Sequence, residues 1–321
     1  MVVTGVGVHG QYELLDGCGL PNTRIEQLHF SDRRSLRTPK HAVQQVEATA
    51  AVVATIKQLR NLGKEKMFSC RRLLHERAYR KRFLDNKDEN LFMGSFESLA
   101  SARASAPPSK LVGYDNAEAA LALYSHQIYF YDYPALFWLG QSLDTGYTRI
   151  FDLGGHIGIK YYAFRRVLRY PEALQWTVCD LPCVVRAGME TALQRKVTHQ
   201  LAFTTDFGDA SGCDILYASG SLQYLPERIG EIIGLLKIKP RRILLNITAV
   251  HPEYTIHTLN SIGFAVCPYR IQQHDELLSE LHLSGYKRRD SWRNEGKTIR
   301  IPFVKGGELP YYAGCCYDLA D

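Results

Sequence analysis

A glycine-rich stretch in the middle of the chain holds the residues best suited to bind a nucleotide-type ligand. Asp152 lies near the end of the apolar run 149–153, and Gly154, Gly155 and Gly158 follow it. Glycines let a backbone approach a ligand closely, and a helix that begins here directs free N–H groups toward that ligand. The pattern predicts a strand, a turn and a helix that bind a cofactor. A tight connection without a ligand is the structural alternative.

The spacing of these glycines argues against a dinucleotide. The fingerprint G-x-G-x-x-G, begun at Gly154, needs glycine at two positions that hold His156 and Ile159. A carboxylate such as Asp152 repels a diphosphate but can organise an ammonium group. We therefore favour a cofactor that carries an amino acid moiety, and an NAD-dependent oxidoreductase is the alternative.

Further acids follow the next strand-like runs. Asp180 and Leu181 come 22 and 23 residues after Gly158. A carboxylate at this place in a parallel sheet binds ribose hydroxyls, although it would also cap the helix that follows. Asp206 and Phe207 come after the third run, where an acid and an aromatic ring can flank an adenine.

A sheet must bring these residues to one edge. The runs that we interpret as strands are 149–153, 175–179, 201–204, 214–218, 242–247, 286–291 and 298–303. Helical patterns fall at 158–169, 183–195, 226–237 and 274–284. This alternation predicts an α/β fold with a mostly parallel sheet, and the turn that begins at Ser219 would cover its pocket.

Helical patterns dominate the first part of the chain. Apolar residues keep helical spacing from Pro39 to about residue 62, and a second helix-like run covers 71–84. Small residues at 95–110 predict a helix that ends in a turn, and 117–124 predicts another helix. We expect an extension without stable structure at 1–35, a helical region for dimerisation or lid formation at 36–145, and the cofactor-binding domain at 146–321.

Composition is that of an ordinary globular protein. The 321 residues are 45% hydrophobic and 22% charged, with a formal net charge of +6. Ten Lys or Arg residues lie in the range 57–82 against two Glu, which indicates a solvated helix face or a site for an acidic partner. Nucleic acid is disfavoured, because Phe68 and Tyr79 are too few for a base-stacking surface.

Several partners and compartments are disfavoured by simple patterns. The eight cysteines include no C-x-x-C pair, so we expect free thiols and no metal site. No stretch of about 18 apolar residues occurs, and the N-terminus lacks a signal-peptide pattern. We therefore expect a cytoplasmic protein without a membrane partner.

These motifs together resemble a known superfamily. Asp152 to Gly158, Asp180-Leu181-Pro182 and Asp214 to Tyr224 look like the cofactor motifs of class I S-adenosylmethionine-dependent methyltransferases. Asp-Leu-Pro is similar to the corresponding motif of small-molecule O-methyltransferases. The resemblance implies a Rossmann-like, mostly parallel sheet of seven strands, with one antiparallel strand near the C-terminus. It also implies S-adenosylmethionine as cofactor, and we favour O-methylation.

From about residue 90 to residue 320 the chain also resembles a bacterial methyltransferase family often associated with surface-polysaccharide genes. This resemblance implies a cofactor and a reaction type and assigns no acceptor; we expect a small-molecule or saccharide-type acceptor. It rests on the motifs Phe92-Met93-Gly94-Ser95-Phe96, Val112-Gly113-Tyr114-Asp115-Asn116, Tyr131-Asp132-Tyr133-Pro134, Gly154-Gly155-His156, Cys267-Pro268-Tyr269-Arg270 and Asp290-Ser291-Trp292.

The sequence departs from the superfamily pattern at two places. His156 stands where the turn usually has a third glycine, and a histidine can adopt the left-handed backbone that the turn requires. Its ring would then face the cofactor or the acceptor. Gln223 and Tyr224 stand where small-molecule O-methyltransferases have a catalytic histidine. A protein that binds the cofactor without catalysis is therefore a further alternative.

Candidates for acceptor recognition follow the fifth predicted strand, over 246–270. His251 has the right ordinary pKa, about 6.5, for a general base, unless it is only a surface-loop histidine. Arg270, beside Tyr269, would pair an anionic acceptor group, or else a structural acid. The aromatic residues Tyr131 and Tyr133 would line a pocket or belong to the core.

Overall fold

The computed structural model describes residues 40–115 and 127–320, and the chain divides into two units, Met1–Lys66 and Met67–Asp321. Helix α1 (Lys40–Asp85) begins in the first unit and ends in the second. It replaces the two helices predicted here, because one interior glycine, Gly63, costs about 1 kcal/mol and does not end a helix. The predictions for 1–35 and 117–124 fall outside the described residues.

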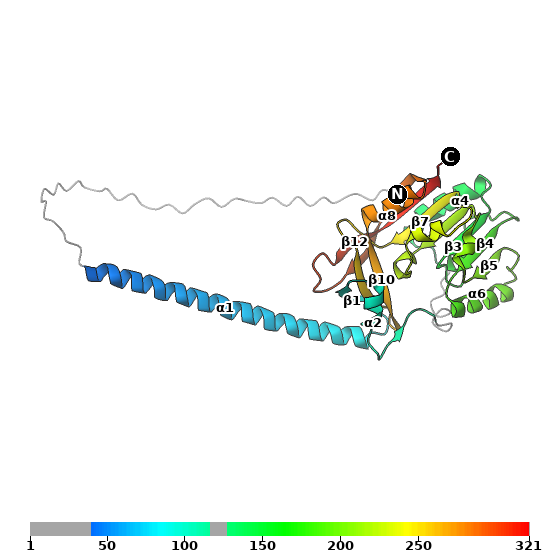
Figure 1. The fold of residues 1–321 in the computed structure, drawn as a ribbon. Helices are drawn as coiled ribbons and strands as arrows, with labels where there is room; N and C mark the ends of the chain where they lie inside the picture. Colours follow the sequence, from blue (N-terminus) through cyan, green and yellow to red (C-terminus); the bar gives the residue numbers. More distant parts are fainter. Residues whose placement is uncertain (1–39, 116–126, 321) are drawn as a thin grey trace, which may run out of the picture. The chain divides into compact units, whose positions relative to one another are not determined.

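The second unit is built on a seven-stranded sheet with the order β11-β12-β7-β6-β3-β4-β5 (Figure 1). Its strands are β3 (Arg149–Leu153), β4 (Gln175–Cys179), β5 (Leu201–Thr204), β6 (Ile215–Ser219), β7 (Arg242–Thr248), β11 (Tyr286–Arg300) and β12 (Glu308–Leu319). Four neighbouring pairs are parallel, and β12 runs antiparallel to both β7 and β11. The predicted mostly parallel sheet is confirmed, and its antiparallel strand lies near the C-terminus.

The last two strands differ from the prediction. The expected strand at 298–303 is instead the end of the long β11 and the connection after it, and the final strand is 308–319. Gly296, between the two predicted strands, has a left-handed backbone, and the pairing register shifts between Glu295 and Ile299. A bulge of this kind bends a strand without ending it.

Helices cover both faces of the large sheet. Their ranges are α4 (Tyr133–Asp144), α5 (Ile159–Phe164), α6 (Pro182–Gln194), α7 (Ile229–Gly234) and α8 (His274–Leu283). Tyr217 of β6 belongs to the apolar cluster that includes α4 and α5, while its neighbour Leu216 belongs to the cluster that includes α7 and α8. Successive strand residues point to opposite faces, so both faces of the sheet are buried and its strand ends are firmly held.

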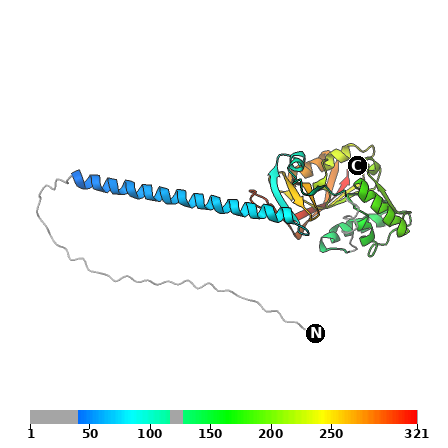
Figure 2. The ribbon, with the colours of Figure 1, turned by 90° about the horizontal axis from the view of Figure 1, so that it is seen from below.

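A second sheet, which we did not predict, lies beside the carboxyl end of β7. It has the order β1-β9-β10-β2, with β8 paired to β10. Cyan β1 lies beside orange β9 and β10 in both views (Figures 1 and 2). The ranges are β1 (Leu91–Phe96), β2 (Leu111–Val112), β8 (Val250–His251), β9 (Ile256–Ser261) and β10 (Ala265–Gln273), and α2 (Leu99–Ala104) follows β1.

This second sheet joins segments from both sides of the domain boundary that we expected at residue 145. Phe92 of β1 and Ile271 of β10 share an apolar cluster with Ile247, which lies at the end of β7. The segment 246–270 is therefore mostly strand and forms a wall beside the strand ends of the large sheet.

Candidate cofactor and acceptor site

The turn after β3 adopts the backbone that its glycines predict. Gly154, His156 and Gly158 have φ angles of +71°, +60° and +85°, all in the left-handed region. His156 therefore takes the place of a glycine, as the sequence led us to expect. Gly158 is the N-cap residue of α5.

Packing within the protein explains two of the glycines. A Cβ atom on Gly154 would overlap the side chain of Ser221, and one on Gly155 would overlap the carboxyl group of Asp152. Ser221 in turn donates a hydrogen bond to the carbonyl of Leu153. The turn therefore packs closely between the end of β3 and the loop after β6. This packing requires glycine at positions 154 and 155 whether or not a ligand binds.

Asp152 supports the turn from behind. Its side chain is 1% exposed and accepts a hydrogen bond from Trp176 Nε1 at 3.0 Å. Burial raises the pKa of this carboxyl to about 7. This burial favours support of Gly155 over the direct contact with a cofactor ammonium group that we predicted.

Asp180 joins the ends of β3 and β4. Its Oδ2 accepts the backbone N–H of His156 at 2.8 Å, and its Oδ1 accepts that of Leu181, also at 2.8 Å. A carboxylate has about four acceptor positions, so two remain for a ligand. Burial raises the pKa of Asp180, and hydrogen bonds donated by ligand hydroxyls would favour its charged form. Leu181 takes part through its backbone, because its side chain is exposed.

The His156 imidazole lies buried beside the turn. Neither of its ring nitrogens has a hydrogen-bond partner among the residues that the structure describes. Burial lowers its pKa to about 4, so the ring is neutral at pH 7 and holds one donor and one acceptor. An unpaired buried polar group is costly, which makes this ring a candidate contact for a ligand.

The segment before residue 116 covers this ring. Tyr114 packs edge-on against His156 with 5.6 Å between ring centroids, and Asp115 accepts the backbone N–H of Cys183 at 2.7 Å. Sequence reasoning missed both residues as site residues, although Gly113-Tyr114-Asp115 contributed to the family resemblance. Their only local signal was a glycine followed by an aromatic and an acid.

Three other predicted cofactor residues lie at neighbouring strand ends. Asp206 follows β5 and caps the short helix η2 (Phe207–Ala210), where its Oδ1 accepts the N–H of Gly208 at 2.8 Å. Phe207 is half-buried, and Ser219 is the last residue of β6. Their roles toward an adenine and a cofactor remain predictions.

Gln223 occupies the loop after β6, in the short helix η3 (Leu222–Tyr224). Its Nε2 donates to the carbonyl of Ile247 at 3.3 Å, and its buried Oε1 has no partner among the described residues. Ile247 has φ +51°, which is strained for a β-branched residue. Such strain is concentrated at functional sites, and here it lies at the carboxyl end of β7.

Asn246, immediately before Ile247, is fully buried and connects three elements. Its Nδ2 donates to the carbonyl of Tyr131 at 3.0 Å, in the helix η1 (Phe130–Asp132). Its Oδ1 accepts hydrogen bonds from Trp292 and Asn294 of β11, each at 3.0 Å. Asn246 therefore holds the Tyr131 backbone and β11 at the end of β7.

The imidazole of His251 is hydrogen-bonded within the turn that follows β8. Its Nδ1 accepts the backbone N–H groups of Glu253 at 3.0 Å and of Tyr254 at 3.2 Å. The neutral ring must then carry its proton on Nε2, which leaves no free lone pair. The ring also stacks on Tyr254 with 4.1 Å between centroids. In the structure the His251 ring stabilises this turn, and its role as a general base remains an untested prediction.

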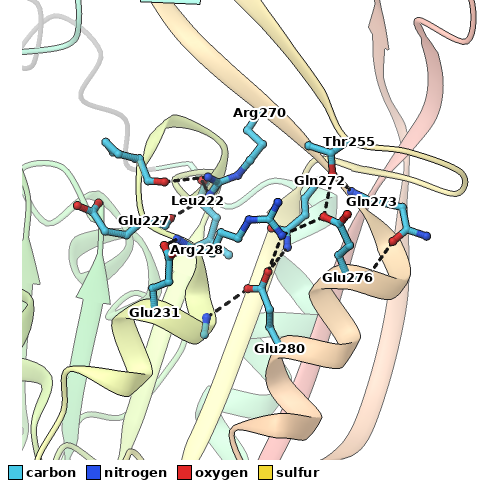
Figure 3. Close-up of polar contacts among 12 residues, drawn as sticks. Leu222, Glu227, Arg228, Glu231, Thr255, Arg270, Gln272, Gln273, Glu276 and Glu280 are labelled. Carbon is cyan, nitrogen blue, oxygen red and sulfur yellow. Dashed lines mark hydrogen bonds and ion pairs between the residues drawn. The ribbon is translucent and has the colours of Figure 1, made fainter. Parts of the chain in front are cut away.

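Arg270 also has structural contacts, and its predicted contact with an acceptor anion remains a prediction. Its guanidinium donates to the carbonyls of Pro226 at 3.0 Å and Glu227 at 2.9 Å, with a longer contact to Leu222 (Figure 3). Burial lowers its pKa. Arg270 thus holds the loop after β6 against β10, and its donors face backbone oxygens.

The predicted aromatic residues are placed in three different environments. Tyr131 is half-buried and stacks on Tyr129, while Tyr133 is 59% exposed at the start of α4. Tyr269 is buried, with its hydroxyl 3.1 Å from that of Tyr312. Among these residues, Tyr131 is hydrogen-bonded through its carbonyl to the Asn246 side chain.

No described helix is long and apolar enough to span a membrane. Within residues 40–115 and 127–320, no group of three or more His, Cys, Asp or Glu side chains could hold a metal ion. The seven described cysteines are free thiols.

No family model and no curated protein matches this sequence. Solved structures with a similar fold include the 1,6-didemethyltoxoflavin-N1-methyltransferase of Burkholderia thailandensis, with 18% identity over 59% of this chain and 77% of that chain and a TM-score of 0.39. The magnesium protoporphyrin IX methyltransferase of Synechocystis PCC 6803 has 13% identity, over 60% and 86%, and a TM-score of 0.39. The [4+2]-cyclase SpnF has 16% identity, over 58% and 80%, and a TM-score of 0.42. All three TM-scores are below 0.5.

Proposed function

We propose that this chain binds S-adenosylmethionine at the carboxyl edge of β3, β4 and β5 and transfers its methyl group to a small-molecule acceptor. The observation that carries the proposal is the Asp180 carboxylate, which fixes the glycine-rich turn and keeps acceptor positions for a ligand. The ring nitrogens of His156, after β3, and the Oε1 of Gln223, after β6, have no hydrogen-bond partner among the described residues. These buried groups fit a polar ligand.

Some residues of the site would bind the cofactor, and another would bind the acceptor. Asp180 would accept the ribose hydroxyls, and Asp206 and Phe207 would flank the adenine. When bound, the cofactor supplies an electrophilic methyl group on a sulfonium. Gln223 Oε1, at the end of β6, would accept a hydrogen bond from the acceptor and orient it.

The site favours positioning over strong proton abstraction. An amide such as Gln223 is not a base, and the low pKa of His156 makes its imidazole a weak one. Holding two reactants in line can nevertheless supply a large part of a rate enhancement. O-methylation of a hydroxyl whose proton is readily lost is the reaction that we favour, on a small-molecule or saccharide-type acceptor.

Calorimetry with S-adenosylmethionine and NAD separates this proposal from the oxidoreductase alternative. We expect S-adenosylmethionine to bind and NAD to bind negligibly. The acceptor is then sought by incubating the protein with isotopically labelled cofactor and a pool of small molecules, and by mass spectrometry of the products. NAD binding without S-adenosylmethionine binding would overturn the proposal. Cofactor binding with no labelled product would favour a non-catalytic protein.

A further inference from the structure

Lys297 lies at the bulge of β11, close to two tyrosine rings. Its ammonium nitrogen is 5.2 Å from the ring centre of Tyr131 and 5.6 Å from that of Tyr312. The preceding residue, Gly296, has φ +86°, and a Cβ atom there would lie 3.3 Å from Phe130. The bulge therefore brings the Lys297 side chain to η1 and β12, where its ammonium contacts the aromatic faces.

The nearby charges do not balance. Lys160 is 2.6 Å from the buried carboxylate of Asp132, whose other oxygen accepts the backbone N–H of Tyr129. Lys297 has no carboxylate partner and no hydrogen bond among the described residues. The Asp132 carboxylate thus lies near two ammonium groups, those of Lys160 and Lys297. Partial burial and the charge of Lys160 lower the pKa of Lys297, as expected for a partly buried cation without a counterion of its own.

The position of Lys297 relates it to the acceptor side of the proposed site. Tyr131, whose ring it covers, is hydrogen-bonded through its carbonyl to Asn246 at the carboxyl end of β7. The strand that bears Lys297 is separated from β3 by β12, β7 and β6 in the sheet order. Lys160, by contrast, is on α5, two residues beyond the cofactor turn.

We propose that Lys297, between the rings of Tyr131 and Tyr312, binds an anionic group of the methyl acceptor, a carboxylate or a phosphate. This inference rests on the proposed function and gives the acceptor a chemical class. An anion here supplies the missing counterion, and the two rings provide apolar contact for the adjoining part of the ligand. Lys297 thereby takes the role that the sequence suggested for Arg270.

Titrations with simple anions test the proposal. Benzoate, acetate and inorganic phosphate are titrated into the full-length protein saturated with S-adenosylhomocysteine, with benzamide as the neutral counterpart of benzoate. Binding is followed by calorimetry and by ligand NMR. We expect at least one anion to bind, benzoate to bind more tightly than benzamide, and Lys297→Met to weaken anion binding about 10-fold to 100-fold, as loss of a charge-assisted hydrogen bond does.

Matched variants separate a binding role from a structural one. Lys287→Met removes an exposed lysine of the same strand and should leave anion affinity unchanged. Lys297→Arg should retain most of it, because the charge remains. Equal anion affinity in wild type and a folded Lys297→Met variant would overturn the proposal, as would the absence of anion binding by the wild type.

Titrations with S-adenosylhomocysteine distinguish a failure of this inference from a failure of the proposed function. S-adenosylhomocysteine should bind Lys297→Met as it binds the wild type, and a loss of its affinity would assign the ammonium to the cofactor and refute the acceptor role. If S-adenosylhomocysteine does not bind the wild type, the proposed function fails. The anion titrations are therefore also run without it, so that anion binding at Lys297 is decided separately.

Discussion

The backbone N–H of His156 donates to the Asp180 carboxylate at 2.8 Å, which connects the residue after the second glycine of the turn to the end of the neighbouring strand. His156 has the left-handed backbone that directs this N–H toward β4. The same carboxylate therefore fixes the turn and remains available to a ligand. A change at Asp180 must affect both functions, and a suitable variant has to keep the shape of the side chain.

Asp180→Asn is that variant. An asparagine keeps one oxygen for a backbone N–H, but its amide group places a donor where the second N–H or a ribose hydroxyl needs an acceptor. We expect S-adenosylmethionine affinity to fall by roughly 1.5–3 kcal/mol, the usual contribution of hydrogen bonds to charged groups, as measured by calorimetry. Glu190→Gln on the exposed face of α6 is the control. Native affinity in a folded Asp180→Asn variant would remove Asp180 from the site.

Gly154→Ala tests the packing of the turn. The new Cβ would overlap Ser221, and an alanine at φ +71° is strained in any case. We expect the free energy of unfolding to fall by about 2–4 kcal/mol in denaturant titrations, from overpacking and left-handed strain together.

A second substitution separates the two causes. Ser221→Gly removes the atoms that the new Cβ meets, so the double variant should recover the part of the loss that comes from overlap. The strain of the backbone should remain. Strictly additive losses in the two single variants would show that the turn and the loop after β6 do not press on each other.

The strands of the large sheet could be predicted because their signal is local. The ranges 149–153, 175–179 and 201–204 agree with β3, β4 and β5, since a strand buried on both faces is a short apolar run bounded by turns. The second sheet has no such signal. Its β1 pairs with β9 between Leu91 and Ser261, and no local pattern shows which distant segments will pair.

The site residues fall into the same two groups, those with a local signal in the sequence and those without one. The turn and Asp180 follow from spacing within one stretch of chain, so the sequence predicts where they lie. The partners of Arg270 and His251 are backbone groups that only the folded chain brings to them. Lys297 was missed because a bulge, which no residue pattern indicated, turns it toward Tyr131.

Arg270→Met should act on stability. The substitution leaves the carbonyls of Pro226 and Glu227 without their donors in a buried place, and we expect a loss of about 2–4 kcal/mol in the free energy of unfolding by urea. Arg293→Met, on an exposed part of β11, should change it little. A native unfolding curve together with a raised KM for the acceptor would restore the anion-binding role of Arg270.

Two buried groups at the cofactor turn should titrate with opposite effects on stability. Burial lowers the pKa of His156 from 6.5 to about 4, so between these values the unfolded chain holds a proton that the folded one does not. Stability from His156 is therefore lost as the pH falls through this window. Burial raises the pKa of Asp152 from 3.8 to about 7, so here the folded chain holds the extra proton, and stability is lost as the pH rises through the window.

These two contributions should largely cancel in the wild type between pH 4 and pH 6.5, and single variants should reveal them. Asp152→Asn keeps the acceptor for Trp176 and leaves the His156 effect alone, so its stability relative to wild type should fall with acid. His156→Gly suits the left-handed backbone and leaves the Asp152 effect, so its relative stability should rise with acid. Each slope should amount to a change on the order of 3 kcal/mol across the window. Urea unfolding at several pH values measures both, and parallel curves for the three proteins would show that neither group is titrated differently by folding.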